Sequence, residues 1–132
     1  MQGRAFRTRP FTRWMRRAGV TDGDLARAVG EMARGLVDAD LGGGLLKKRI
    51  PLPGRGRRGG ARVIVAARRN QRWFFLYGFA KNERETLTPA ELRALRELGK
   101  EFLRLDERGL SRALRAGALA EVCGDETQEQ AP

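Results

Sequence analysis

The sequence predicts a single α+β domain, because amphipathic helical stretches flank a central block of strand-forming runs. Residues 61–67 and 72–79 are rich in β-branched and aromatic side chains and are separated by a short polar turn, a pattern typical of neighbouring antiparallel strands. Helix-start signals lie on both sides of this block. A chain of 132 residues can bury roughly two thirds of its unfolded surface, so we expect one core over residues 1–123.

The N-terminal part predicts a strand followed by a two-helix hairpin. Residues 5–9 alternate weakly between apolar and polar side chains, and Pro10 is expected to end this strand. The next helix has apolar residues at helical spacing and closes at Gly19. Thr21 and Asp24 form a capping box for a second helix, which a short turn joins to the first. Its predicted buried stripe comprises Leu25, Ala28, Val29, Met32 and Leu36.

Three further strands complete an expected antiparallel sheet of about four strands, at residues 45–52, 61–67 and 72–79. In the first, Lys48 shares a face with apolar neighbours, whereas Lys47 and Arg49 point to the other face. We interpret residues 38–44, with two aspartates and three glycines, as a flexible connection.

The last of these strands is apolar on both faces, which is typical of a central strand covered on both sides. Simple alternation puts Trp73, Phe75, Tyr77 and Phe79 on one face and Phe74 and Leu76 on the other. Such a run can be imagined as a platform on which nucleobases stack. We interpret it as core, because burying each ring contributes about 2 kcal/mol.

Two C-terminal helices follow the sheet. Thr88 is the expected N-cap of the first, with Pro89 at its first position and Glu91 at its third, and the helix should run to about Arg104. A shorter helix is expected at residues 107–116. Residues 124–132 carry too little apolar surface to fold and are expected to form a flexible acidic tail.

Positive charge is concentrated in the central third of the chain. Residues 41–82 carry eleven Lys or Arg side chains and no Asp or Glu, and the other ninety residues carry sixteen of each sign. The whole net charge of +11 therefore lies in this segment. A sheet with this distribution is suited to bind a polyanion such as a nucleic acid.

Residue types that are scarce or absent exclude several kinds of chemistry. The chain has no histidine, which excludes histidine-based nucleases and Ser-His-Asp hydrolases. The single Cys123 excludes an internal disulfide and a thiolate metal cluster, as expected for a reducing cytoplasm. The basic N-terminus lacks the apolar run of a secretory signal. No cofactor is expected.

Residues 54–59 match the dinucleotide-binding pattern GxGxxG, but their context is wrong. That fingerprint opens a helix and has an acidic residue about twenty positions later. Here another strand follows, and the next acidic residue is Glu83. The loop instead places Arg55, Arg57 and Arg58 between glycines, where they can bind the phosphates of RNA. For any single one of these arginines, an ordinary soluble loop is an equally good interpretation.

The most informative group of cations comes from three strands. Lys47, Arg49 and Arg62 lie on two of them, and Lys81 and Arg84 follow the third. The start of one antiparallel strand lies near the end of its neighbour, so these side chains can gather at one edge of a groove. Crowded cations favour a neutral lysine that acts as a base, and arginines stabilise a pentacoordinate phosphate. RNA supplies its own 2′-OH nucleophile. The alternative is a solvated basic face.

The chain resembles the RelE/HigB-like toxins of bacterial type II toxin–antitoxin modules, in particular a phage-associated branch. The resemblance lies in FRT at residues 6–8 before a helix with Trp14, EMARGLVDADLGGG at 31–44, KKR at 47–49, PGRG at 53–56, GGAR at 59–62, WFFLYGF at 73–79 and KNER at 81–84. It implies a RelE/ParE-like fold with a basic groove. It also implies an mRNA endoribonuclease (mRNA interferase) that acts on the ribosome, leaves a 2′,3′-cyclic phosphate and inhibits translation.

The resemblance also implies roles for individual residues. Arg62 matches the arginine that binds the scissile phosphate, and Lys47 and Arg49 resemble a basic pair of which one member is the candidate base. Lys81 matches the basic residue after the aromatic strand, while Lys48 and Arg84 are expected to contact RNA. Asn82 stands where many relatives carry a second cation, so Arg84 is a candidate substitute. The partner implied is an antitoxin, a helix-turn-helix repressor that covers the groove.

Two other functions are compatible with these residues. A ParE-like toxin that inhibits DNA gyrase shares the fold but does not cut RNA. A simple basic nucleic-acid-binding protein would bind with steep salt dependence and without cleavage.

Overall fold

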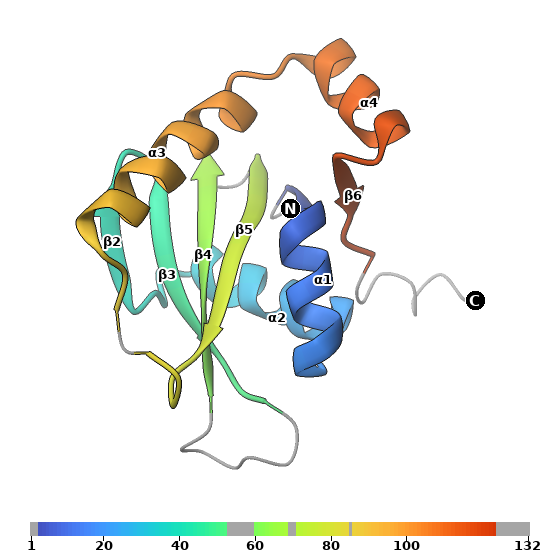
Figure 1. Ribbon diagram of the computed structural model, residues 1–132. Helices are drawn as coiled ribbons and strands as arrows, with labels where there is room; N and C mark the ends of the chain where they lie inside the picture. The colour runs from blue at the N-terminus through green and yellow to red at the C-terminus, as the bar shows by residue number, and fades with distance from the viewer. Residues whose placement is uncertain (1–2, 53–59, 69–70, 85, 124–132) are drawn as a thin grey trace.

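A computed structural model describes residues 3–52, 60–68, 71–84 and 86–123. Its centre is a six-stranded mixed sheet in the order β2-β3-β4-β5-β1-β6 (Figure 1). The strands are β1 (Arg4–Thr8), β2 (Ala39–Gly42), β3 (Leu45–Ile50), β4 (Ala61–Arg68), β5 (Arg72–Ala80) and β6 (Leu119–Glu121). The helices are α1 (Arg9–Ala18), α2 (Asp22–Ala33), α3 (Pro89–Leu103) and α4 (Glu107–Ala116).

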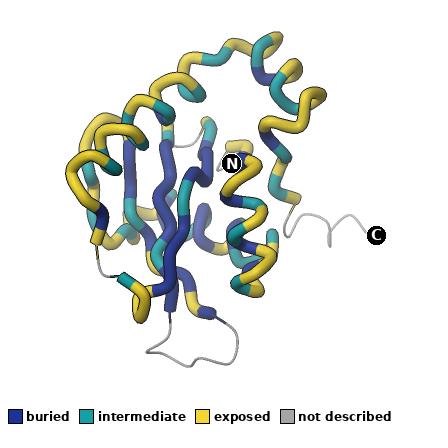
Figure 2. The backbone as a smooth tube through the Cα atoms, in the orientation of Figure 1, coloured by how far each residue is buried: buried dark blue, intermediate teal, exposed yellow. Residues whose placement is uncertain are grey.

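The helices divide between the two faces of the sheet. Apolar residues of α1 and α2 pack with one set of strand residues, and those of α3 and α4 pack with the other set. The central strands β4 and β5 are therefore buried on both faces, as the dark blue tube in Figure 2 shows. This confirms the α+β class and the prediction of a central strand covered on both sides.

The sheet differs from the expected one in the number of its strands and in the relative direction of one strand pair. It has six strands rather than about four, and β1 pairs with β5 in parallel. The prediction missed β2 and β6, which have only four and three residues. The segment interpreted as a flexible connection instead contains β2, which pairs with β3 through an irregular register. Strands of three or four residues are too short to show the alternation of apolar and polar side chains from which a strand is predicted.

The helix boundaries largely follow the capping residues. Thr21 and Thr88 both form the expected capping boxes, and Gly19 ends α1 with a φ of 81°. Pro10 lies in the first turn of α1 rather than ending a strand, because Thr8 already caps that helix. Leu36 lies beyond the end of α2 and is 54% exposed, so its assignment to the buried stripe was wrong.

A β-bulge in β5 reverses the expected alternation of side chains. Ile64 pairs with Tyr77 and Val65 with Phe75, which leaves Leu76 as an extra residue. Tyr77 and Phe79 therefore pack on the α3 face with Phe74 and Leu76, whereas Trp73 and Phe75 face α1 and α2. The predicted grouping of Tyr77 and Phe79 with Trp73 and Phe75 was wrong, because one inserted residue shifts every later side chain to the other face.

The bulge also turns Gly78 toward α1. A Cβ atom at this position would lie 2.4 Å from the Trp14 ring, so only glycine lets the ring lie against the strand. On the other face, a Cβ at Gly99 would lie 2.9 Å from the Cβ of Ala66, which shows how closely α3 approaches β4. These two glycines set the positions of α1 and α3 on the sheet.

Candidate nucleic-acid interface

Two arginines lie directly opposite each other at one end of the sheet. Arg49 of β3 pairs with Arg62 of β4, and Arg62 pairs in turn with Phe79 of β5. Directly opposed residues on antiparallel strands point to the same face. Lys47 lies two residues before Arg49, so it shares this face, in a row with Ile64 and Tyr77. The structure therefore brings Lys47, Arg49 and Arg62 onto one face of the sheet, which we call the basic face.

Lys81 joins the same end of the sheet through Gly60. The backbone N–H of Lys81 donates a hydrogen bond of 3.1 Å to the carbonyl oxygen of Gly60. A Cβ at Gly60 would lie 3.6 Å from the Nε atom of Arg49, so the arginine side chain passes close to this glycine. Lys81 itself is exposed. Lys81 therefore lies at the end of the sheet that carries Arg49 and Arg62, whereas Lys47 lies two residues further from this end along β3.

An acidic residue holds Arg62 in place. The Nε atom of Arg62 lies 3.3 Å from Oδ2 of Asp38, and the Arg62 side chain is only 15% exposed. Asp38 immediately precedes β2, the edge strand that sequence reasoning missed. Asp38 was interpreted from the sequence as part of a flexible connection. Its carboxylate instead restricts the orientation of the guanidinium group at the centre of the basic face.

Lys48 occupies a different environment from its two basic neighbours. It lies on the face covered by α2, is 7% exposed, and its Nζ atom is 2.7 Å from Oε1 of Glu31. The hydrogen bond from Lys48 is the main reason why the pKa of Glu31 is lowered. The strand alternation turns its side chain into the interface with α2, whereas the prediction that Lys48 contacts RNA needs this side chain on an open surface. Lys48 ties α2 to the sheet.

Arg84 is held by α3. Its two terminal nitrogens donate to Glu91, at 3.0 and 2.5 Å, and one of them is also 3.5 Å from the Tyr77 hydroxyl oxygen. The guanidinium carbon lies 5.6 Å from the centroid of the Phe79 ring. The Arg84 hydrogen bonds, followed by one from the Thr88 backbone, lower the pKa of Glu91 to about 2. Arg84 therefore connects the α3 N-terminus to the basic face.

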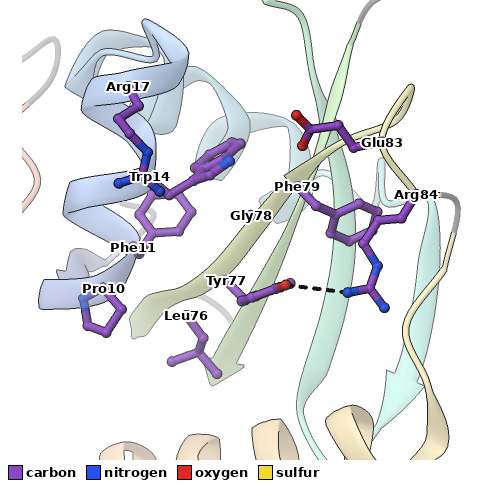
Figure 3. Close-up of a pocket in the computed structure, with 10 residues that line it drawn as sticks. All are labelled: Pro10, Phe11, Trp14, Arg17, Leu76, Tyr77, Gly78, Phe79, Glu83 and Arg84. Atoms are coloured by element: carbon purple, nitrogen blue, oxygen red, sulfur yellow. Dashed lines mark hydrogen bonds between the residues drawn. The ribbon is translucent and has the colours of Figure 1, made fainter.

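A hollow of about 290 Å³ lies beside β5 (Figure 3). Trp14 and Arg17 of α1 line one side of it, and Tyr77 and Phe79 of β5 line the other with Arg84. A second hollow of about 270 Å³ shares Trp14, Arg17 and Glu83 with the first. Sequence reasoning missed this feature because the bulge that turns Tyr77 and Gly78 has no clear signal in the sequence.

One comparison with known proteins identifies the family. The family model described as "RelE toxin of RelE / RelB toxin-antitoxin system" matches residues 3–122. The chain belongs to the RelE toxin family. It is therefore a toxin of a toxin–antitoxin module, and its partner is an antitoxin. A comparison with curated proteins found no match.

The RelE match spans both the basic face and the helices that support it. Arg55, Arg57 and Arg58, which were predicted to bind RNA, lie outside the described residues. Within the described residues, no group of three or more His, Cys, Asp or Glu side chains can hold a metal ion. No helix in the same part of this RelE toxin is long and apolar enough to span a lipid bilayer.

Proposed function

We propose that this RelE-family toxin is an endoribonuclease that cuts mRNA on the ribosome, without a metal ion, and so inhibits translation in the cytoplasm. The observation that supports the proposal is the direct opposition of Arg49 and Arg62 on one face, with Lys47 beside them. Guanidinium groups at directly opposed positions can donate hydrogen bonds to the same phosphate. Such a pair is costly in a sheet, since like charges directly opposite destabilise it.

The proposed reaction uses the 2′-OH of RNA as the nucleophile. The 2′-oxygen attacks the adjacent phosphorus, the bond to the 5′-oxygen breaks, and a 2′,3′-cyclic phosphate and a free 5′-OH result. Charge accumulates on the equatorial oxygens of the pentacoordinate phosphate. Arg49 and Arg62 are proposed to stabilise this charge, and the ion pair with Asp38 would limit the rotation of Arg62.

Two lysines supply the proton transfers in this scheme. Guanidinium groups stay protonated in proteins, so of the pair Lys47 and Arg49 only the lysine can accept the 2′-OH proton. Lys81, which follows β5 directly, is proposed to donate a proton to the departing 5′-oxygen. Arg84, which Glu91 holds, is assigned an electrostatic role beside the phosphate rather than a proton transfer.

The antitoxin partner is proposed to be a helix-turn-helix repressor that covers the basic face. An acidic surface on such a partner would neutralise Lys47, Arg49 and Lys81, and would exclude mRNA by occupying the same groups. The antitoxin would thus bind in competition with RNA.

Primer extension on ribosome-bound mRNA tests the proposed activity. The purified toxin should produce new ends within the message, and the upstream fragments should carry cyclic phosphates. Arg62→Ala should abolish cutting, whereas Arg93→Ala, which removes one exposed charge from α3, should not. Intact mRNA together with inhibited DNA gyrase in a parallel cleavage assay would overturn the proposal in favour of ParE-like inhibition.

A further inference from the structure

The hollow beside β5 lies where one edge of the strand has lost its partner. Pairing between β1 and β5 ends at Arg7 and Phe75, and within the described residues no strand continues it alongside residues 76–80. β1 ends there because Thr8 turns the chain into α1 as the helix N-cap. This edge of β5 therefore faces the hollow, which Leu76, Gly78 and Phe79 help to line.

Aromatic rings reach this hollow from both faces of β5. Trp14 lies against Gly78 on the α1 side, and the bulge brings Tyr77 and Phe79 to the α3 side (Figure 3). Tyr77 and Trp14 are both partly exposed, unlike Phe75 and Trp73 in the core. Partly exposed rings beside a narrow hollow can stack on a planar heterocycle, and nearby arginines strengthen such stacking.

The charges around the hollow fit a nucleotide. Arg17 and Arg84 line it from opposite sides (Figure 3). Arg17 is exposed and can bind a phosphate beside an inserted base, whereas the Arg84 guanidinium, which Glu91 already holds, adds positive charge on the other side. Glu83 also lines it, and a carboxylate accepts hydrogen bonds from the exocyclic amino group of a base. Tyr77 lines the hollow and also lies in the same row of the sheet as Lys47 and Ile64, so one residue borders both the hollow and the face proposed to bind the scissile phosphate.

We propose that this hollow is a subsite for a nucleobase of single-stranded RNA that carries an exocyclic amino group. The proposal rests on the proposed function, and it names the part of the RNA that the toxin recognises. A volume of about 290 Å³ suits one planar ring system, at the lower end of small-molecule sites. Trp14, Arg17 and Glu83 line both hollows, so two successive bases can contact the same three residues.

Fluorescence of Trp14 tests the subsite without any cleavage. Five-nucleotide RNAs with 2′-O-methyl sugars cannot be cut, and they should quench the emission of Trp14, because Trp73 is fully buried. Cytosine-containing chains should bind more tightly than uracil-containing ones, which lack the amino group. Arg17→Ala should weaken binding about tenfold, whereas the exposed Arg112→Ala on α4 should leave it unchanged. Glu83→Ala should remove the preference for cytosine over uracil.

Several outcomes would overturn the subsite. One is the absence of quenching by any RNA, and another is equal weakening by Arg17→Ala and Arg112→Ala. Quenching by the antitoxin alone would assign the hollow to a protein partner instead. Cleavage of mRNA by wild-type toxin without quenching would refute the subsite and leave the proposed function intact. Quenching without cleavage would leave an RNA-binding subsite on a protein that is not a nuclease.

Discussion

Arg49 and Arg62 face each other across the β3–β4 pair, and both belong to the same face of the sheet. Like charges in this position are unfavourable, and the carboxylate of Asp38 compensates Arg62. A local conflict of this kind, in a chain whose caps and core are otherwise regular, is typical of a functional site. These two arginines are therefore the first residues to mutate.

Arg62→Ala should abolish RNA cleavage and change the free energy of unfolding by less than about 1 kcal/mol. The substitution removes a largely buried stem and its ion pair with Asp38, and this loss is offset because the repulsion from Arg49 is relieved. Arg62→Lys keeps the charge but loses the fork of donors, so activity should be intermediate. Primer extension and urea unfolding measure the two effects. Full activity of Arg62→Ala would remove this residue from the mechanism.

The neighbouring lysines should behave in opposite ways. Lys47→Ala should lose cleavage and keep its stability, because Lys47 lies on the basic face and is only partly buried. Lys48→Ala should lose about 1–3 kcal/mol of stability and keep cleavage in the folded protein, because it removes a buried stem and the partner of Glu31. Urea unfolding and primer extension on both variants make the comparison, and loss of cleavage in a stable Lys48→Ala protein would contradict it.

Strong local signals allowed most of the fold to be predicted. The caps at Thr21 and Thr88 fix where α2 and α3 begin, since their side chains accept hydrogen bonds from backbone N–H groups of the first turn. The alternation in β3 correctly separated Lys47 and Arg49 from the face of Leu46 and Ile50. These features depend on residues close together in the sequence, so the sequence alone specifies them.

Features that depend on long-range pairing could not be predicted. The bulge at Leu76 arises from the register with β4. Gly78, a glycine inside the strand, is a general signal of a bulge but does not fix its position. β6 forms because its three residues pair with β1, which lies more than a hundred positions earlier in the chain. Asp38, the partner of Arg62, lies just before β2, and Glu91, the partner of Arg84, lies in α3. The sequence did not indicate that these two acidic residues hold the arginines in position.

The contact between Glu91 and Arg84 should make stability depend on pH in the acid range. The pKa of Glu91 is lowered from an ordinary 4.5 to about 2 in the folded state. A lowered carboxyl pKa stabilises the fold fully above about pH 4.5, and this contribution is lost as the pH falls through about 2. The difference in unfolding free energy between wild type and Glu91→Gln should therefore shrink between these two values.

Urea unfolding at several pH values measures this difference. The exposed Glu101→Gln on the same helix is a matched control and should show no comparable gap from wild type. A gap between wild type and Glu91→Gln that is the same at pH 2 and pH 6 would show that the Arg84 contact does not control the titration of Glu91.

Gly78→Ala should destabilise the protein by about 1–3 kcal/mol, because the new methyl group overlaps the Trp14 ring and forces it away from β5. Gly23→Ala is a suitable control, since its Cβ would meet only Thr21 Oγ1 at an ordinary 3.6 Å, and in a helix alanine is favoured over glycine. Trp14→Leu combined with Gly78→Ala should cost less than the sum of the two single changes, because removing the ring removes the overlap. Urea unfolding of all four variants makes the test. Additive effects would show that the Trp14 ring does not pack on Gly78. Trp14 would then not form the side of the hollow beside β5.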